Sequence, residues 1–277
     1  MLRKRIIFTL IYNDGYFMQS RNFRLQRVGD VHWLEKNYQF QKIAFSLDEL
    51  IVLNATRNNS NINKFAKTIA QIRKDVFIPV AAGGGIRHMK DVEVLFQHGA
   101  DKIVLNSIFY TDQDLVKKLV NRYGSQSIIA SVDYKMRAHT PTICIENGAK
   151  ELNISLHDHL QNIQLLRAGE IYLNCIDKDG TGFGYDFETV HNIGSYLHIP
   201  LILAGGAGNE KHLLEGLQIT SVHAVATANL FNFVGDGLPT ARKKIVGAGF
   251  NLANWGTILD KVVYKSKEDT CLTIKQF

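Results

Sequence analysis

Two aspartates stand where acid–base chemistry would need them. Asp133 ends the apolar run Ser127–Asp133, where a buried carboxylate is costly unless it is paired or used. Asp179 follows another apolar run and lies within Asp177–Gly182, a segment whose aspartates and glycines are also typical of a plain turn. We predict that Asp133 and Asp179 are catalytic residues that accept or donate a proton, with Asp177 as a further candidate.

Two glycine-rich turns suggest phosphate binding. Gly83–Gly85 and Gly205-Gly206 each follow an apolar run, and backbone without side chains can bring its N–H groups onto a phosphate. The apolar run that follows each glycine turn along the chain ends in small or polar residues. A helical segment comes next in each case, and the N-terminus of a helix favours an anion. One such turn is usually only a turn, but two at matching places favour two phosphate sites. The predicted phosphate-binding residues are Gly84, Gly85, Asn106, Ser107, Gly205, Gly206, Ala228 and Asn229.

Short apolar runs alternate with amphipathic stretches along the chain and would position these residues. Continuous apolar runs are typical of strands buried on both faces of a parallel sheet. Eight of them, each followed by a helical pattern, predict a closed (β/α)₈ TIM barrel. A doubly wound open sheet is the alternative, but the dinucleotide fingerprint expected after its first strand is absent. The predicted strands are Arg5–Ile11, Glu49–Asn54, Ile78–Ala82, Lys102–Asn106, Ser127–Asp133, Glu170–Cys175, Pro200–Ala204 and His223–Thr227, and the predicted helices include Ile62–Lys74, Met89–His98, Gln113–Arg122, Leu156–Arg167 and Lys211–Gln218.

The predicted barrel repeats itself as two half-barrels. Ile78–Gly85 resembles Ile199–Gly206, and Ile11 holds in the first half the place that Asp133 holds in the second. Because active sites of this fold lie at the carboxyl ends of the strands, the two glycine turns would lie on opposite sides of the barrel mouth. The substrate should therefore be long and anionic at both ends. We expect the barrel to occupy residues 1–248, and residues 249–277 to form a C-terminal extension of unknown role.

Composition narrows the class of protein. The 277 residues are 45% hydrophobic and 21% charged, which fits one globular domain, and no apolar run approaches the roughly 20 residues of a membrane helix. The net charge of +6 comes without a dense Lys/Arg stripe, so we expect small phosphorylated molecules and not nucleic acid as partners. Cys144, Cys175 and Cys271 show neither a disulfide framework nor metal-ligand spacing. We expect a cytoplasmic protein without metal or cofactor.

Seven segments carry a resemblance to a known family: Met1–Ile7, Gly83–Ile86, Gly99–Lys102, Tyr123–Gln126, Asp177–Thr181, Gly184–Asp186 and Gly205–Gly208. Together they resemble the cyclase subunit of imidazole glycerol phosphate synthase, the HisF family, over roughly residues 1–235. The resemblance implies a glutaminase partner that releases ammonia at the amino-terminal face of the barrel. The ammonia then crosses the barrel interior and reacts at the carboxyl-terminal face.

The resemblance also implies a ring of four charges that forms the ammonia gate. Its members are Arg5, Glu49, Lys102 and Glu170, and each lies at the start of a predicted strand. Their signs balance two against two, so they can pair with one another, and a purely structural salt-bridge plug is the alternative. Asp101 matches the residue that the family uses to contact the glutaminase.

Three positions depart from the family at the active-site end. The family has aspartates where this chain has Ile11 and Asn54, and a lysine where it has Gln19. Loss of a general acid or base typically lowers a rate about 10²–10⁴-fold. This combination resembles divergent family members that work beside a glutaminase and a separate sugar amidotransferase.

We therefore expect a HisF-like, ammonia-channelling synthase subunit of a glutamine amidotransferase complex. The resemblance to the divergent members implies that it serves acetamidino-sugar formation for surface polysaccharide such as lipopolysaccharide. One alternative is a genuine cyclase subunit of histidine biosynthesis. Another is a non-catalytic scaffold that activates a glutaminase.

Overall fold

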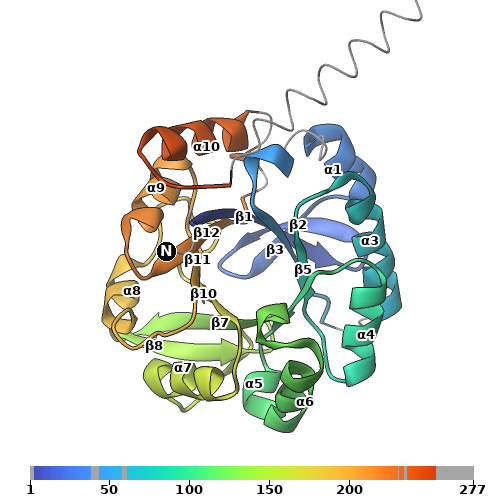
Figure 1. Cartoon of the computed structure of the whole chain (residues 1–277), viewed down its shortest axis with the longest axis vertical. Coiled ribbons are helices and arrows are strands. Elements are labelled where there is room, and N and C mark those ends of the chain that lie inside the picture. The colour runs from blue at the N-terminus through green and yellow to red at the C-terminus, as the bar shows by residue number, and fades with distance from the viewer. Residues whose placement is uncertain (1–2, 39–43, 58–60, 230, 234–235, 254–277) are drawn as a thin grey trace, which may run out of the picture.

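The computed structural model describes residues 3–38, 44–57, 61–229, 231–233 and 236–253, and these ranges fold as a (β/α)₈ barrel (Figure 1). The parallel strands follow the order β10-β11-β12-β1-β4-β5-β6-β7, and β10 also pairs with β7. That last pairing closes the barrel, so the prediction of a TIM barrel is confirmed and the open-sheet alternative is wrong. The barrel strands are β1 (Arg5–Asn13), β4 (Glu49–Asn54), β5 (Val80–Gly83), β6 (Lys102–Leu105), β7 (Ile128–Arg137), β10 (Glu170–Cys175), β11 (Leu201–Ala204) and β12 (Val222–Thr227).

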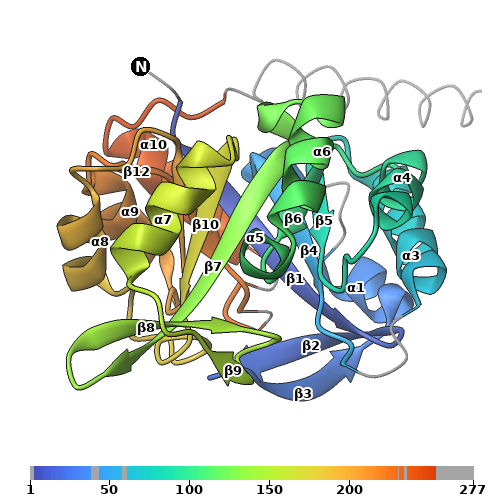
Figure 2. The ribbon, with the colours of Figure 1, turned by 90° about the horizontal axis from the view of Figure 1, so that it is seen from below.

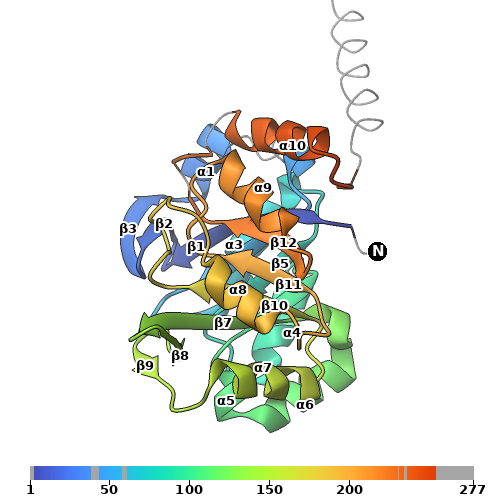
Figure 3. The same ribbon diagram turned by 90° about the vertical axis from the view of Figure 1, so that its left-hand side faces the viewer.

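Two antiparallel hairpins extend the barrel beyond its carboxyl-terminal face. β1 continues into β2 (Tyr16–Arg21) and β3 (Arg24–Gly29), and β7 continues into β8 (Thr140–Ile145) and β9 (Lys150–Glu151). Figures 2 and 3 show both hairpins at the end of the barrel opposite the amino terminus. The apolar-run analysis missed them because their strands are short and partly exposed.

Helices pack around the strands and begin at side-chain caps. Asn61, Asp112, Ser155, Asp186 and Asn209 each accept a hydrogen bond from a backbone N–H in the first turn of a helix, which satisfies a donor that has no partner within the helix. The helices are α1 (Val31–Tyr38), α3 (Ile62–Asp75), α4 (Met89–Gln97), α5 (Ile108–Thr111), α6 (Gln113–Tyr123), α7 (Leu156–Leu165), α8 (Phe187–Ile193), α9 (Glu210–Gln218) and α10 (Gly237–Gly247), with 3₁₀ turns at Ala44–Ser46 and Ser125–Ser127.

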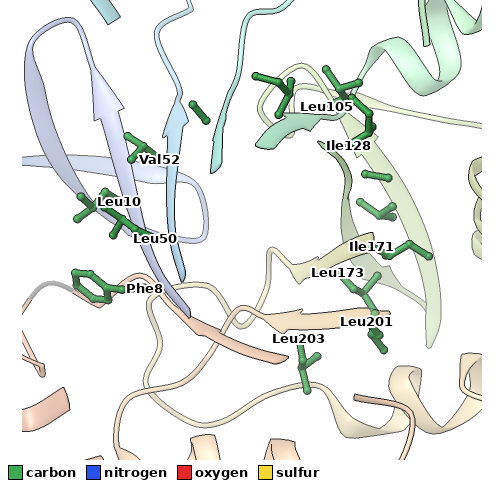
Figure 4. Packing of buried hydrophobic residues seen from close by; sticks show 14 of the residues in the cluster. Phe8, Leu10, Leu50, Val52, Leu105, Ile128, Ile171, Leu173, Leu201 and Leu203 are labelled. Atoms are coloured by element: carbon green, nitrogen blue, oxygen red, sulfur yellow. The ribbon is translucent and has the colours of Figure 1, made fainter. Parts of the chain in front are cut away.

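The apolar core has two layers because successive strand residues point to opposite faces. The outer layer lies between strands and helices, and Figure 4 shows its members, among them Phe8, Leu50 and Leu173, directed away from the barrel axis. The inner layer fills the interior of the barrel, which we call the lumen. It consists of Ile7, Ile51, Ala81, Val104, Ile129, Tyr172, Ile202, Ala204, Ala224 and Ala226.

A buried ion pair ties the last helix to the barrel. Arg242 of α10 donates to both oxygens of Asp48, and Asp48 in turn accepts the N–H of Ile6 at 2.8 Å. The eighth β/α unit is thereby attached to the starts of β1 and β4. Residues 254–277 of the expected extension lie outside the described residues, so its boundary stays a prediction. In the described part of the chain, no helix is long and apolar enough to cross a membrane.

Candidate active site

One cavity of about 700 Å³ opens at the carboxyl ends of the barrel strands. Active sites of this fold lie at that face. Asp133 of β7 and Asp179 of the loop after β10 both line it, as do residues from the ends of β1, β4 and β6. The eight predicted phosphate-binding residues also lie along its wall: Gly84, Gly85, Asn106, Ser107, Gly205, Gly206, Ala228 and Asn229.

Two asparagines hold the carboxylate of Asp133. Asn106 Nδ2 donates to Oδ2 at 2.8 Å and Asn174 Nδ2 donates to Oδ1 at 2.9 Å. Burial raises the pKa of Asp133 to about 7, although the two amide hydrogen bonds oppose that shift and the charge of Asp179 adds to it. A carboxyl group with a pKa near neutrality can serve as general acid or general base at physiological pH.

Asp179 anchors the β2–β3 hairpin as well as lining the cavity. Its Oδ2 accepts hydrogen bonds from Ser20 Oγ and from the N–H of Phe23, and its carbonyl oxygen accepts the N–H of Asn22. Burial raises its pKa. Asp179 therefore stabilises the turn of the β2–β3 hairpin, a role that the sequence did not indicate.

Asp177 lies outside the cavity-lining set. Its Oδ2 accepts the N–H of Met136 at 2.7 Å, and its carbonyl oxygen accepts a hydrogen bond from Asn22. The candidate role of Asp177 in acid–base chemistry is therefore not supported, because its side chain links the loop after β10 to the β7–β8 hairpin.

The first glycine turn has a backbone that only glycine accommodates. Gly84 has a φ of +97°, and a Cβ atom there would come within 2.1 Å of the carbonyl oxygen of Asn54. The side chains near this turn already have partners: Asn106 donates to Asp133, and Ser107 Oγ accepts the N–H of Glu146 at 3.3 Å. An anion here would be bound mainly by backbone N–H groups.

The second glycine turn is constrained in the same way. Gly205 and Gly206 have φ values of +83° and +116°, and the carbonyl oxygen of Gly206 accepts the N–H of Gly184. Asn229 Oδ1 accepts the N–H groups of Phe231 and Asn232, so this side chain forms the turn after β12. The backbone conformation thus requires glycine at both turns, and both turns line the same cavity.

The β8–β9 turn contributes residues that the sequence analysis missed. Glu146 and Asn147 line the cavity, and both have positive φ angles, as does Gly148. Asn147 Nδ2 donates to the carbonyl oxygen of Ala55, and Arg57 donates to the carbonyl oxygen of Asn147. The turn therefore bridges to the loop after β4 at one side of the mouth. The run Glu-Asn-Gly was a turn signal, but nothing in it placed the turn over the barrel mouth.

The charged ring lies at the opposite end of the lumen. Arg5 donates to Glu49 Oε2 at 2.8 Å and is paired with Glu170, and Lys102 Nζ donates to Glu49 Oε2 at 3.0 Å and to Glu170 Oε1 at 2.7 Å. The sequence prediction that these four charges pair with one another is therefore confirmed.

The two carboxylates of the ring differ in environment. Glu49 is 1% exposed, burial raises its pKa, and its Oε1 has no hydrogen-bond partner among the described residues. Burial would also raise the pKa of Glu170, but hydrogen bonds and charge from Arg5 and Lys102 outweigh burial and lower it. One carboxylate oxygen inside the ring is thus left with unused acceptor capacity.

Comparison with known proteins agrees with this architecture. A family model described as histidine biosynthesis protein matches residues 5–235. The chain is 43% identical over 256 residues to a Parasynechococcus marenigrum (strain WH8102) protein named "Putative imidazole glycerol phosphate synthase subunit hisF2", with 92% of this chain and 95% of that protein covered. The chain belongs to the HisF family.

Other HisF relatives have lower sequence identity to this chain but align over nearly the same share of it. A protein of Streptococcus sanguinis (strain SK36) is 32% identical over 91% of this chain and 99% of its own length. A protein of Dehalococcoides mccartyi (strain CBDB1) is 31% identical over 90% of this chain and 97% of its own length. Both are named imidazole glycerol phosphate synthase subunit HisF, so the family is one of enzyme subunits.

Within this HisF-family barrel, the three positions where the resemblance implies other residues all reach the cavity. Ile11, Gln19 and Asn54 line it. Ile11 and Leu53 lie opposite each other on the paired strands β1 and β4, so they form a continuous apolar stretch of the wall. The resemblance implies an acidic group at position 11, and the structure shows that nothing in this stretch can transfer a proton.

The pKa of Asp133 gives a direct test of the site. The raised value means that the folded chain holds this proton to higher pH than the unfolded chain, so this group's contribution to stability falls as pH rises from about 4 to about 7. We expect the ¹³C resonance of the Asp133 carboxyl to titrate near pH 7. Asn174→Leu should raise that midpoint because a hydrogen bond to the ionised form is lost.

Asn162→Leu, on the outer helix α7, is the matched control and should leave the midpoint unchanged. A midpoint near the ordinary aspartate value of about 4 in the folded wild-type chain would contradict the assignment.

Proposed function

We propose that this chain is the ammonia-using barrel subunit of a glutamine amidotransferase complex of the imidazole glycerol phosphate synthase type. A glutaminase would supply ammonia at the amino-terminal face, and a doubly phosphorylated substrate would receive it in the cavity. The observation that carries the proposal is the arrangement along one lumen: a charged ring at one end, an apolar layer in the middle and a cavity with a buried acid at the other.

The lumen supports ammonia passage because of its chemistry. Ammonia is lost by protonation in water, and a path that excludes water protects it. The inner layer is built largely of aliphatic side chains, which suits a small neutral molecule. At the amino end, Glu49 Oε1 is a buried acceptor without a partner among the described residues, and ammonia carries N–H donors that could satisfy it.

The amino-terminal face supports docking of a protein partner. Phe77 follows α3 at this face and is 81% exposed, and Leu165 ends α7 at the same face and is 77% exposed. A partner that covered this face would bury both side chains, and burial of apolar surface stabilises a protein contact. Asp101 lies at this face as well, but its Oδ2 accepts the N–H of Val80 at 2.8 Å and pairs with Arg73. Asp101 would therefore contact a glutaminase only through the part of its carboxylate that this structural bond leaves free.

Two anion sites follow from the two glycine turns. Beside the first glycine turn lies the start of α5, where backbone N–H groups favour an anion, and both segments line the cavity. Beside the second lies the turn after β12, whose N–H groups at Phe231 and Asn232 are already bonded to Asn229, so an anion there would depend mainly on the glycine backbone. Phosphate or sulfate soaked into crystals of the chain should bind at both, one beside Gly84 and Ser107 and the other beside Gly206 and Ala228. Density at neither turn, or N–H groups directed into the protein interior, would contradict this assignment.

Two reactions fit this arrangement. The relatives' names support imidazole ring formation in histidine biosynthesis. Ile11 supports the second candidate, which is amidation that serves an acetamidino sugar through a separate sugar amidotransferase. The reason is that β1 brings Ile11 to the cavity at the position where the resemblance implies an acidic group for closure of the imidazole ring. A scaffold without turnover is the third reading, and the buried acid Asp133 argues against it.

Replacement of Ile11 separates these readings. With ammonium salt and the phosphorylated intermediate of imidazole glycerol phosphate synthesis, we expect the wild-type chain to turn over well below about 1 s⁻¹, the lower end of ordinary enzyme rates. Ile11→Asp should raise turnover at least about tenfold, since a general acid or base is typically worth about 10²–10⁴. Leu53→Asp is the matched control, because it places a carboxylate beside the same apolar stretch on β4.

Each result of this experiment favours a different one of the three functions. Wild-type turnover within the ordinary enzyme range would identify a working cyclase of histidine biosynthesis and overturn the argument from Ile11. No turnover by wild type or Ile11→Asp, together with no binding of the intermediate, would favour the scaffold.

A further inference from the structure

Two hydrogen-bonded links cross the lumen between the same two strands. β1 and β10 are not neighbours in the barrel, because β11 and β12 lie between them on one side. At the amino end, Arg5 of β1 pairs with Glu170 of β10 within the charged ring. Further along the same strands, Thr9 Oγ1 of β1 lies 3.2 Å from the hydroxyl of Tyr172 of β10. The phenol ring of Tyr172 must therefore reach across the interior to meet Thr9.

We propose that Tyr172 and Thr9 form an inner gate on the ammonia path, between the charged ring and the cavity. This inference rests on the proposed function and adds a positioning pair to it. The charged ring controls entrance into the lumen, whereas the Tyr172–Thr9 pair would control delivery into the cavity.

The location of Tyr172 supports this role. It is 4% exposed and packs in the inner apolar layer with Ile7 and Ile51, yet it also lines the cavity, as does Thr9. One side chain thus forms both the top of the apolar layer and the floor of the cavity. Val104 and Ala226 also belong to both, so Tyr172 carries the polar group at this boundary between the layer and the cavity.

Tyr172 also shares its strand face with the residue that holds the buried acid. Alternate residues of a strand share a face, so Glu170, Tyr172 and Asn174 follow one another along the lumen side of β10. Asn174 holds Asp133 Oδ1 at 2.9 Å. On β10, Tyr172 is therefore one step toward the amino end from the asparagine that holds the predicted catalytic carboxylate.

The chemistry of the pair suits ammonia. A hydroxyl can accept a hydrogen bond from ammonia and donate one to it, and a buried hydroxyl is costly unless it has a partner. Thr9 supplies that partner when no ammonia is present. Burial raises the pKa of Tyr172, so the phenol keeps its proton and does not convert ammonia to trapped ammonium. An aliphatic residue would fill the same space without this exchange of partners.

The test compares glutamine with free ammonium as the nitrogen source, using the full chain with its co-expressed glutaminase. Tyr172→Phe keeps the ring and removes the hydroxyl, and Thr9→Val removes the partner at nearly constant shape. Tyr134→Phe is the matched control, since Tyr134 is a buried tyrosine of β7 in the outer core that donates to Asp186 at 2.8 Å. The readouts are nitrogen incorporated into the phosphorylated intermediate per glutamine hydrolysed, and turnover with ammonium salt.

We expect Tyr172→Phe and Thr9→Val each to lower the incorporation per glutamine at least about threefold more than they lower turnover on ammonium salt, because free ammonia enters by the cavity mouth. Tyr134→Phe should change neither readout. If both variants incorporate as much nitrogen per glutamine as wild type, the gate is wrong but the proposed function stands. If activity falls equally with glutamine and with ammonium salt, the Tyr172–Thr9 pair only stabilises the structure and the gate is again wrong. A wild-type complex that incorporates no glutamine nitrogen would overturn the proposed function and the gate with it.

Discussion

The charged side chains at the amino end of the barrel lie where water cannot solvate them freely, so each depends on the others for its hydrogen bonds. Removing one partner of such a buried group typically costs about 3–5 kcal/mol, because a charge is left unpaired. Glu49 and Glu170 are each shared by Arg5 and Lys102, which come from strands on different sides of the lumen. The ring therefore fixes the spacing of four strands at their starts while leaving one oxygen of Glu49 available.

The same requirement for pairing organises the other end of the barrel. Asp133 is buried, and amides from β10 and from the loop after β6 hold its two oxygens in place. Asp179 is buried too, and its partners come from the β2–β3 hairpin. Asp133 and Asp179 are thus each oriented by elements other than their own. Between the two ends, the hydroxyl of Tyr172 finds its partner, Thr9, across the lumen.

The barrel and much of its site could be predicted from the sequence because the signals are local. Apolar runs marked the eight barrel strands to within a few residues, and strand position alone placed Arg5 and Glu170 at one end and Asp133 at the other. Long-range contacts could not be predicted in this way. The bond of Asp177 to Met136, the bond of Asp101 to Val80 and the reach of Tyr172 to Thr9 each join residues whose proximity arises only when the barrel closes.

The central claim is that nitrogen reaches the cavity through the lumen and not through solvent. It is tested most directly by supplying the chain and its glutaminase with glutamine labelled with ¹⁵N at the amide, and measuring the label in the phosphorylated product. The medium contains unlabelled ammonium in excess of the ammonia that glutamine releases, at a concentration that gives no measurable turnover by itself. The account predicts that the product keeps the glutamine label at near-full enrichment while the medium stays unlabelled. A product whose enrichment matches that of the medium would contradict it, because the ammonia would then have left the protein before it reacted.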